Sequence, residues 1–243
     1  IKENLIILTD GEKITSLVEK GAADISGYKE IDLKGGYIMP GLITMHVHLA
    51  GTGKPQKKQR DNAKLVKTIM ANGLTRAVAY KLVSSFAKLE LLSGVTTIRT
   101  VGGLGSFDTR LRDEIAAGKK DGPRILASNQ GISVPGGHMA GSVAVAVTSE
   151  EEAAKLVDEC VKEKVDLIKL MITCGVLDAK QKGVPGELKM PPEIVRAACE
   201  RAHEAGLKVA AHVESPIGVK VALENGVDSI EHGAKPDEEI IKL

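Results

Sequence analysis

Residues 42–49 read LITMHVHL and place two histidines two positions apart in an apolar run. Side chains at positions i and i+2 of a β-strand point to the same face, so His46 and His48 would share one face with Thr44. The residues of the other face are apolar: Ile43, Met45, Val47 and Leu49. That face can pack against helices. Two imidazoles on one strand face can bind one Zn²⁺ at about 2.0–2.1 Å, or they can be ordinary core or surface histidines.

Downstream of this stretch, short apolar strands alternate with segments of helical period, which predicts a parallel α/β fold. Six predicted strands end near these polar residues: His46, Thr100, Gln130, Lys169, His212 and His232. A closed (β/α)₈ barrel of the TIM type needs two more strand–helix units. The chain is therefore either an open parallel sheet or part of a longer protein, and we favour the second interpretation.

The first 38 residues have a different pattern. Their short apolar runs are interrupted by TDGEK and EKGAAD, which is typical of hairpin-rich β structure. We therefore expect two domains, residues 1–38 and residues 39–243.

The composition excludes several classes of protein. With 33 basic and 32 acidic residues the net charge is +1, which does not favour binding to nucleic acid or to an anionic membrane surface. The longest uncharged apolar run is far below the ~18 residues that span a bilayer, and we see no secretory leader. Cys160, Cys174 and Cys199 are too few for a disulfide framework. We expect a cytoplasmic protein.

Three further residues at predicted strand ends could carry chemistry. His212 in KVAAHVE and His232 in DSIEHG would reach the carboxyl edge of the sheet, where parallel α/β folds build their sites. Lys169 lies in the apolar strand DLIKLMIT, opposite a face formed by Ile168 and Leu170. A lysine there can extend to solvent or pair with a carboxylate. It can also be a reactive amine that forms a Schiff base or, with CO₂, a carbamate.

The order of these motifs resembles the amidohydrolase superfamily. GGYIMPGLITMHVHL (35–49) is similar to the signature of its first barrel strand, and the similarity continues through IKLM (168–171), AAHVES (210–215) and SIEHG (229–233). The resemblance implies a (β/α)₈ barrel joined to a small β-sandwich, with residues 1–38 as the amino-terminal share of that sandwich.

The same resemblance implies a binuclear site with two divalent metal ions, Zn²⁺ in the first instance. His46 and His48 would bind the more buried ion, and His212 and His232 the second. Lys169 would be carboxylated by CO₂ and would bridge the two ions. The superfamily usually has an aspartate where this chain has Thr44. Its catalytic aspartate, at the end of the eighth strand, would lie beyond the end of this chain.

The loop VPGGHMAG (134–141) narrows the resemblance to the imidazolonepropionase-like and Xaa-Pro dipeptidase (prolidase-like) branch. There the loop histidine, His138 in this chain, would lie beside the substrate. The alternative is a solvated histidine in a glycine-rich turn. The stretch 172–190 differs from the branch. His203, on a helix among charged residues, is interpreted as surface, and Asp228 is not expected to be the catalytic base.

These observations predict a hydrolase of amide or peptide bonds. Its substrate would be a small molecule, either a dipeptide or an N-acyl amino acid. The protein could form a homo-oligomer. This chain alone is expected to be inactive, because two strands and the base are missing from it. One alternative is a mononuclear-metal deaminase or cyclic amide hydrolase of the same superfamily. Another is a metal- or ligand-binding protein without catalysis. A nucleotide-binding protein is disfavoured, because VGGLGS does not match G-x-G-x-x-G at the start of a helix.

Overall fold

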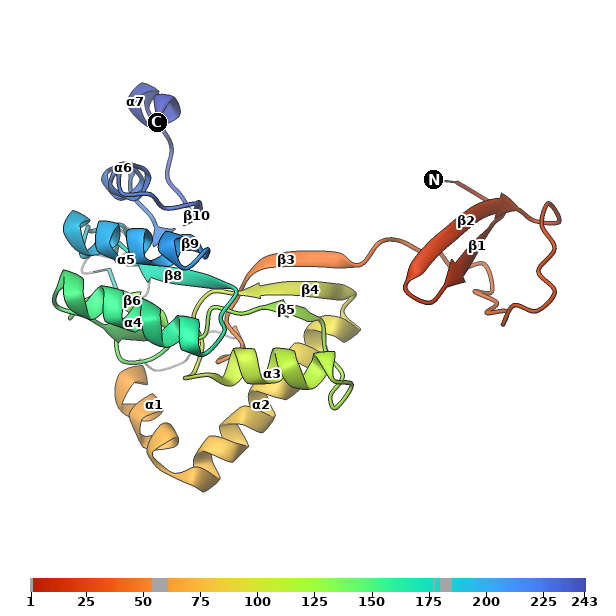
Figure 1. Cartoon of the computed structure of the whole chain (residues 1–243), viewed down its shortest axis with the longest axis horizontal. Coiled ribbons are helices and arrows are strands. Elements are labelled where there is room, and N and C mark those ends of the chain that lie inside the picture. The colour runs from red at the N-terminus through yellow and green to blue at the C-terminus, as the bar shows by residue number, and fades with distance from the viewer. Residues whose placement is uncertain (1, 54–60, 177, 180–184) are drawn as a thin grey trace. The chain divides into compact units, whose positions relative to one another are not determined.

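A computed structural model describes residues 2–53, 61–176, 178–179 and 185–243 (Figure 1). The chain divides into two compact units, Ile1–Pro40 and Gly41–Leu243. Part of the stretch 172–190, which departs from the family pattern, lies outside the described residues. None of the helices in the described ranges is both long enough and apolar enough to cross a lipid bilayer.

The first unit contains a β-hairpin. Strands β1 (Leu5–Asp10) and β2 (Lys13–Glu19) pair antiparallel, with a register shift after Leu8. Gly11 in the turn has φ +55°, in the left-handed region that glycine enters without steric cost. The predicted hairpin is therefore present. Its assignment to a β-sandwich stays a prediction.

The second unit contains two sheets in which every strand pair is parallel. The first has the order β3-β4-β5, and the second the order β10-β9-β8-β6-β7. The strand bounds are β3 Leu42–Val47, β4 Val95–Thr100, β5 Arg124–Leu126, β6 Gly131–Ser133, β7 Ala144–Ala146, β8 Leu167–Met171, β9 Lys208–Val213 and β10 Ser229–His232. The parallel α/β architecture predicted from the sequence is confirmed.

The prediction of a single third strand that ends near Gln130 is wrong in detail. This segment consists of two short strands: β5 pairs with β4, and β6 pairs with β8 and β7. Between them the buried residues Ser128 and Asn129 interrupt the ladder. The backbone N–H of Gly102 donates to Ser128 Oγ (2.9 Å), and that of Thr109 donates to Asn129 Oδ1 (3.0 Å). Side chains therefore satisfy backbone groups where the chain passes from one sheet to the other.

The described ranges contain seven helices. Their bounds are α1 Asn62–Ala71, α2 Gly73–Leu92, α3 Phe107–Ala116, α4 Glu150–Lys162, α5 Pro192–Glu204, α6 Pro216–Glu224 and α7 Glu238–Lys242. At the start of α4, Ser149 and Glu152 have the S-x-x-E spacing that predicts a capping box, and Ser149 Oγ accepts from the backbone N–H of Glu152 (3.2 Å). The second half of the predicted capping box differs. The Glu152 carboxylate accepts from the backbone N–H of Thr148 (2.7 Å).

Strand β8 separates the main core from the inner side of the sheet. Its residues Ile168 and Leu170 pack with side chains of α4 and α5 in the largest apolar cluster. On the opposite face, Leu167 packs with Val101 and Ala210. Lys169 alternates with Ile168 and Leu170, so the strand directs its side chain to this inner side.

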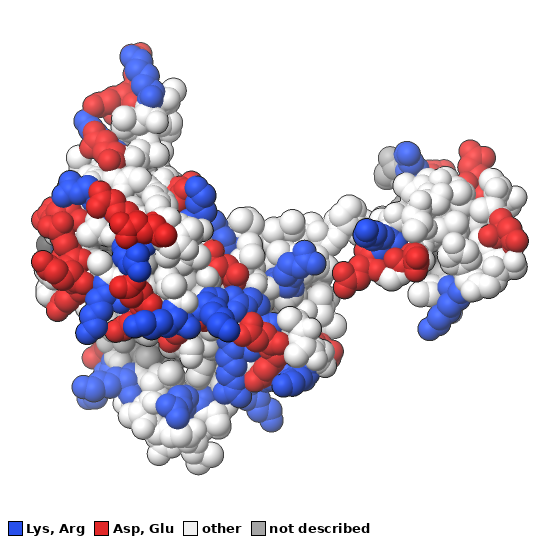
Figure 2. All heavy atoms as spheres, viewed as in Figure 1, with Lys and Arg blue, Asp and Glu red and all other residues white. Residues whose placement is uncertain are grey.

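The apolar face predicted for β3 is only partly buried. Leu49 lies in a core cluster, whereas Ile43 is 63% and Met45 48% exposed. The reason is that β3 is an edge strand, which pairs with β4 alone among the described residues. The charged surface is mixed. In the view of Figure 2, acidic and basic side chains alternate over the second unit, in keeping with the net charge of +1.

A buried carboxylate at the start of α3 gives a stability prediction. Asp108 is buried, and its Oδ2 has no hydrogen-bond partner among the residues that the structure describes. Burial raises the pKa of Asp108 to about 6, and a hydrogen bond from the Thr100 hydroxyl acts in the opposite direction. Because the folded pKa lies above the unfolded value of about 3.9, the native state gains stability as the pH falls from about 6 towards 4. Asp108→Asn should therefore raise the free energy of unfolding by about 1–3 kcal/mol at about pH 8.

Denaturant unfolding of both proteins at about pH 8 and pH 4 measures this effect. The gain should shrink at the lower pH, where Asp108 is protonated in the native state. An equal effect of Asp108→Asn at both pH values would contradict it.

Candidate metal centre

The two histidines of β3 meet at the carboxyl end of the strand. His46 Nε2 lies 3.2 Å from His48 Nε2. Each ring uses its other nitrogen for a protein contact. His46 Nδ1 lies 2.7 Å from Glu231 Oε2, and His48 Nδ1 lies 3.0 Å from the carbonyl oxygen of Gly102. Such contacts fix the ring orientation of metal-binding histidines. Both Nε2 atoms are therefore directed to one point.

The Gly102 contact needs a glycine. Its φ is +126°, and a Cβ at this position would lie 3.3 Å from the His48 ring. Burial lowers the pKa of His48 to about 4, partly opposed by the Gly102 carbonyl. His48 is consequently a neutral imidazole, the form that binds metal ions.

His212 and His232 approach the same place from β9 and β10. The centroid of the His232 ring lies 4.7 Å from that of His46 and 4.8 Å from that of His212. His212 is buried, its Nε2 has no hydrogen-bond partner in the described part of the chain, and burial lowers its pKa to about 2. His232 has φ +68°, a left-handed conformation that is rare for a residue other than glycine.

Lys169 is buried, at 1% exposure, and its Nζ has no hydrogen-bond partner among the described residues. Burial lowers its pKa to about 7, while Glu231 acts in the opposite direction. The interpretation that the amine extends to solvent is therefore wrong. A substantial fraction of this lysine is a neutral amine at physiological pH, which is the form that reacts with CO₂.

His138 stacks on His212. The ring centroids are 4.0 Å apart and the planes are inclined by 14°. Its Nδ1 is paired with a carboxylate oxygen of Asp178. Gly175 permits this stack, since a Cβ there would lie 2.6 Å from the His138 ring. His138 is buried, so the interpretation of a solvated turn histidine is wrong.

Three acidic residues that the sequence analysis did not select contact these histidines. Glu231 contacts His46, Asp178 contacts His138, and Glu214 Oε1 lies 3.9 Å from His212 Nε2. The sequence held a signal for Glu214, because H-V-E at 212–214 has the same i, i+2 spacing as H-V-H at 46–48. Sequence spacing gave no comparable signal for Asp178, which lies in a loop.

Glu231 also joins β3, β4 and β10. Its carboxylate is paired with the guanidinium of Arg99, and Arg99 Nε donates to the carbonyl oxygen of Met45 (2.8 Å). The side chains of Glu231 and Arg99 are both largely buried. Desolvation raises the pKa of Glu231. Hydrogen bonding from His46 and the charges of Lys169 and Arg99 outweigh this effect and lower the pKa to about 2. The carboxylate that contacts His46 is therefore ionised.

His203 and Asp228, which are not expected to belong to the site, lie outside the histidine group formed by His46, His48, His212 and His232. His203 is 41% exposed, and its Nε2 lies 2.8 Å from Asp228 Oδ2. Asp228 also accepts from Lys208 Nζ and from the backbone N–H of Val209. Asp228 therefore connects α5, β9 and β10 by hydrogen bonds and has no contact with the histidine group in the described ranges.

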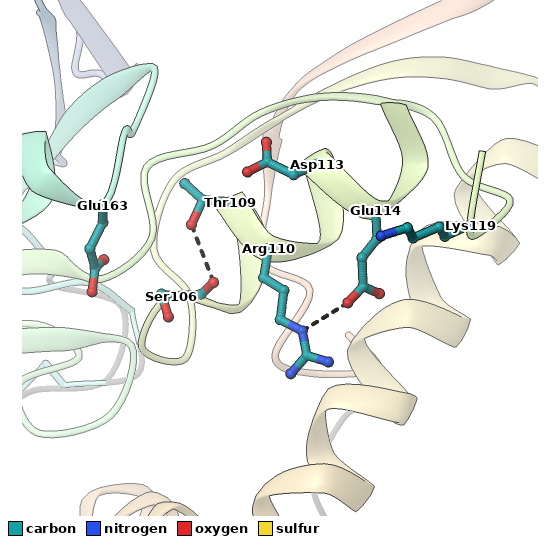
Figure 3. A pocket seen from close by; sticks show the side chains of 7 residues that line it. All are labelled: Ser106, Thr109, Arg110, Asp113, Glu114, Lys119 and Glu163. Carbon is teal, nitrogen blue, oxygen red and sulfur yellow. Dashed lines mark hydrogen bonds and ion pairs between the residues drawn. The ribbon is translucent and has the colours of Figure 1, made fainter. Parts of the chain in front are cut away.

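A surface depression of about 480 Å³ lies along α3 (Figure 3). Its lining residues are Ser106, Thr109, Arg110, Asp113, Glu114, Lys119 and Glu163. Arg110 and Glu114 are paired with each other (2.9 Å). None of the predicted site residues lines this depression.

The donor set at the histidine group fits divalent metal ions. Imidazole nitrogens and carboxylate oxygens are the ligands that Zn²⁺ binds in catalytic sites. The possible ligand atoms of His212, Glu214 and His232 all lie within 4.8 Å of one another. Within the described ranges, His212 Nε2 and Glu214 Oε2 are buried polar atoms without hydrogen-bond partners, and a bound cation would satisfy both.

Curated proteins with similar sequences include a mycobacterial relative. An uncharacterized protein of Mycobacterium tuberculosis (strain ATCC 25618 / H37Rv) is 28% identical over 209 residues, which are 86% of this chain and 48% of that protein. This chain thus spans about half the length of the curated relatives that it matches.

Solved structures extend the comparison. A Xaa-Pro dipeptidase with methionine bound in its active site is 30% identical, with a TM-score of 0.77, over 97% of this chain and 58% of that one. A prolidase complexed with N-methylphosphonate-L-proline is 25% identical, with a TM-score of 0.80, over the same shares of the two chains.

These neighbours confirm the predicted fold class, a part of a TIM-type barrel. The family model described as "Amidohydrolase family" matches residues 37–243. Members of this family generally use divalent metal ions, which agrees with the donor set of the histidine group. With most of its length matched, this chain belongs to the amidohydrolase family.

Proposed function

We propose that this chain carries the metal-binding strands of a hydrolase that cleaves the C–N bond of a dipeptide or an N-acyl amino acid. The observation that carries the proposal is the meeting of four histidines and a buried lysine from four parallel strands. His46 and His48 would hold one divalent ion, and His212 and His232 a second. Lys169, from β8, would bridge them as a carbamate.

Charge supports the modification of Lys169. A buried ammonium without a partner loses several kcal/mol of solvation and would be repelled by two dications. Carbamate formation removes that charge, because the neutral amine attacks CO₂, forms an N–C bond and releases one proton. The product is an anion with two oxygens. The lowered pKa of Lys169 makes the neutral amine available for this step.

The protein residues around the ions would have distinct roles. When bound, two such ions lower the pKa of a shared water towards about 7 and polarise the scissile carbonyl. Glu231 holds His46 in one orientation, and the Gly102 carbonyl holds His48. Asp178 is paired with Nδ1 of His138, so the other ring nitrogen would be the one that contacts a substrate.

The substrate class rests on the prolidase-like neighbours. One binds methionine and another a phosphonate analogue of proline, both of which present a carboxylate. We propose a small substrate of this kind for the present protein. The stacking of His138 on His212 supports a substrate role for His138, because it places this side chain directly beside the proposed metal ligands.

Metal removal tests the proposal. The full-length protein that contains this chain should hold about two divalent ions per chain, measured by inductively coupled plasma mass spectrometry. It should hydrolyse members of a panel of Xaa-Pro dipeptides and N-acyl amino acids. A chelator should abolish the hydrolysis, and added Zn²⁺ should restore it.

His203→Ala is the matched control, because His203 is an exposed histidine outside the group. This variant should keep both its metal and its activity. Hydrolysis that survives complete metal removal would contradict the proposed function. One ion per chain with an unmodified Lys169 would favour a mononuclear-metal deaminase or cyclic amide hydrolase instead.

A further inference from the structure

Glu214 follows β9 on the same face as His212. The two residues are two positions apart, so an extended backbone directs both side chains to the inner side of the sheet. The structure places Glu214 Oε1 3.9 Å from His212 Nε2. This distance is too long for a hydrogen bond. The carboxylate and the imidazole therefore approach each other without bonding directly.

The separation suits two ligands of one ion. Zn²⁺ binds nitrogen and oxygen at about 2.0–2.2 Å, so two donors on the same ion lie at most about 4.4 Å apart. The 3.9 Å between Glu214 and His212 falls inside this limit. The possible ligand atoms of His212, Glu214 and His232 all lie within 4.8 Å of one another, only slightly more than this limit.

Each of the two facing groups has one enclosed polar atom without a hydrogen-bond partner among the described residues. Glu214 Oε2 and His212 Nε2 are enclosed and accept or donate no hydrogen bond in the described parts of the chain. His212 itself is 3% exposed. An enclosed carboxylate oxygen without a partner destabilises the fold unless a cation or donor satisfies it. A divalent ion between the two atoms would satisfy both.

The backbone of Glu214 is held in place. Its N–H donates to Thr173 Oγ1 (3.0 Å), and Thr173 is fully buried. Gly186, with φ +97°, packs so closely that a Cβ there would lie 2.4 Å from the Glu214 carbonyl oxygen. Two residues that come after β8, Thr173 and Gly186, thus hold the backbone of Glu214, and a fixed backbone helps to preorganise a ligand.

We propose that Glu214 is a third protein ligand of the second metal position, together with His212 and His232. This inference rests on the proposed function, because that position is one of its two ion positions. It adds a carboxylate that belongs to this chain and needs no modification. Two histidines and one carboxylate are a ligand set found in catalytic zinc sites.

A Co²⁺ titration of the metal-free, full-length protein tests the inference, followed by visible absorption and by metal analysis. Glu214→Gln preserves shape and removes the charge. It should weaken binding of the second equivalent of Co²⁺ by at least about 10-fold, since even residues that only orient ligands have effects of 10–100-fold. The absorption bands of that equivalent should change. Glu214→Asp, which keeps a carboxylate, should lose less affinity.

The control is Glu224→Gln, a glutamate that is 47% exposed on α6, and it should match the wild type. His232→Ala should lose the same equivalent as Glu214→Gln. Unchanged Co²⁺ affinity and spectrum in Glu214→Gln would overturn the inference, even if its hydrolysis were slower. It would leave the proposed function standing if the wild type is active. A wild-type protein that binds no Co²⁺ would overturn both.

Discussion

Lys169→Ala should remove the bridging metal and the hydrolytic activity of the full-length protein together. Lys169 Nζ is buried without a hydrogen-bond partner among the described residues, and Lys169 lies on the same face of its sheet as His212. If its carbamate supplies two oxygens to the ions, the alanine variant leaves two dications without the anion between them. Metal content should fall below about two ions per chain, and kcat by at least about 100-fold.

Short carboxylates should partly restore this variant. Acetate or formate fits the volume left by the lysine side chain and supplies the two oxygens that the carbamate would provide. Activity and metal content of Lys169→Ala, measured with and without such additives, check this expectation. Lys88→Ala, which removes an exposed lysine of α2 that pairs with Asp121, is the matched control and should behave as wild type. An active Lys169→Ala protein with normal metal content and no additive would contradict the bridging role.

Local sequence signals predicted most of the fold. The cap at Ser149 and the alternation in β8 depend on residues a few positions apart, and the structure contains both. The split of the third strand was not predictable in this way. It depends on Ser128 accepting from the backbone of Gly102, 26 positions away, and on the turn at Asn129, which has φ +55°. Neither this hydrogen bond nor this turn leaves a periodic pattern in the sequence.

The histidine group shows the same division. His46 and His48 share a face because of their spacing, which the sequence gives directly. The contact of His46 with Glu231 spans 185 positions and is visible only in the folded chain. At β10, strand alternation alone would not predict that both Glu231 and His232 reach this group. In the ladder Glu231 pairs with His212, so it is Glu231 that faces inward by register.

His232 reaches the group by a different route. Its left-handed φ of +68° turns the side chain out of the strand pattern, and its ring then lies near those of His46 and His212. Such backbone conformations are uncommon outside glycine and occur where the surrounding structure holds them. The sequence motif that precedes Gly233 suggested a strand end, but not this turn.

His46→Ala and His48→Ala should each abolish metal binding at the position proposed between them. The two Nε2 atoms face each other at 3.2 Å, and each ring is held through Nδ1, by Glu231 and by the Gly102 carbonyl. Either variant leaves one imidazole where two are needed. We expect loss of about one ion per chain and of at least about 100-fold in kcat, measured by metal analysis and steady-state kinetics.

His203→Ala separates this effect from the general loss of a histidine, because His203 lies on the surface beside Asp228. Thermal unfolding of the metal-free variants gives a second control. Without metal, His48→Ala should unfold at a temperature close to that of the wild type, whereas with Zn²⁺ only the wild type should be stabilised, since a ligand stabilises the state that binds it. Equal stabilisation of His46→Ala and wild type by Zn²⁺ would show that the ion binds elsewhere.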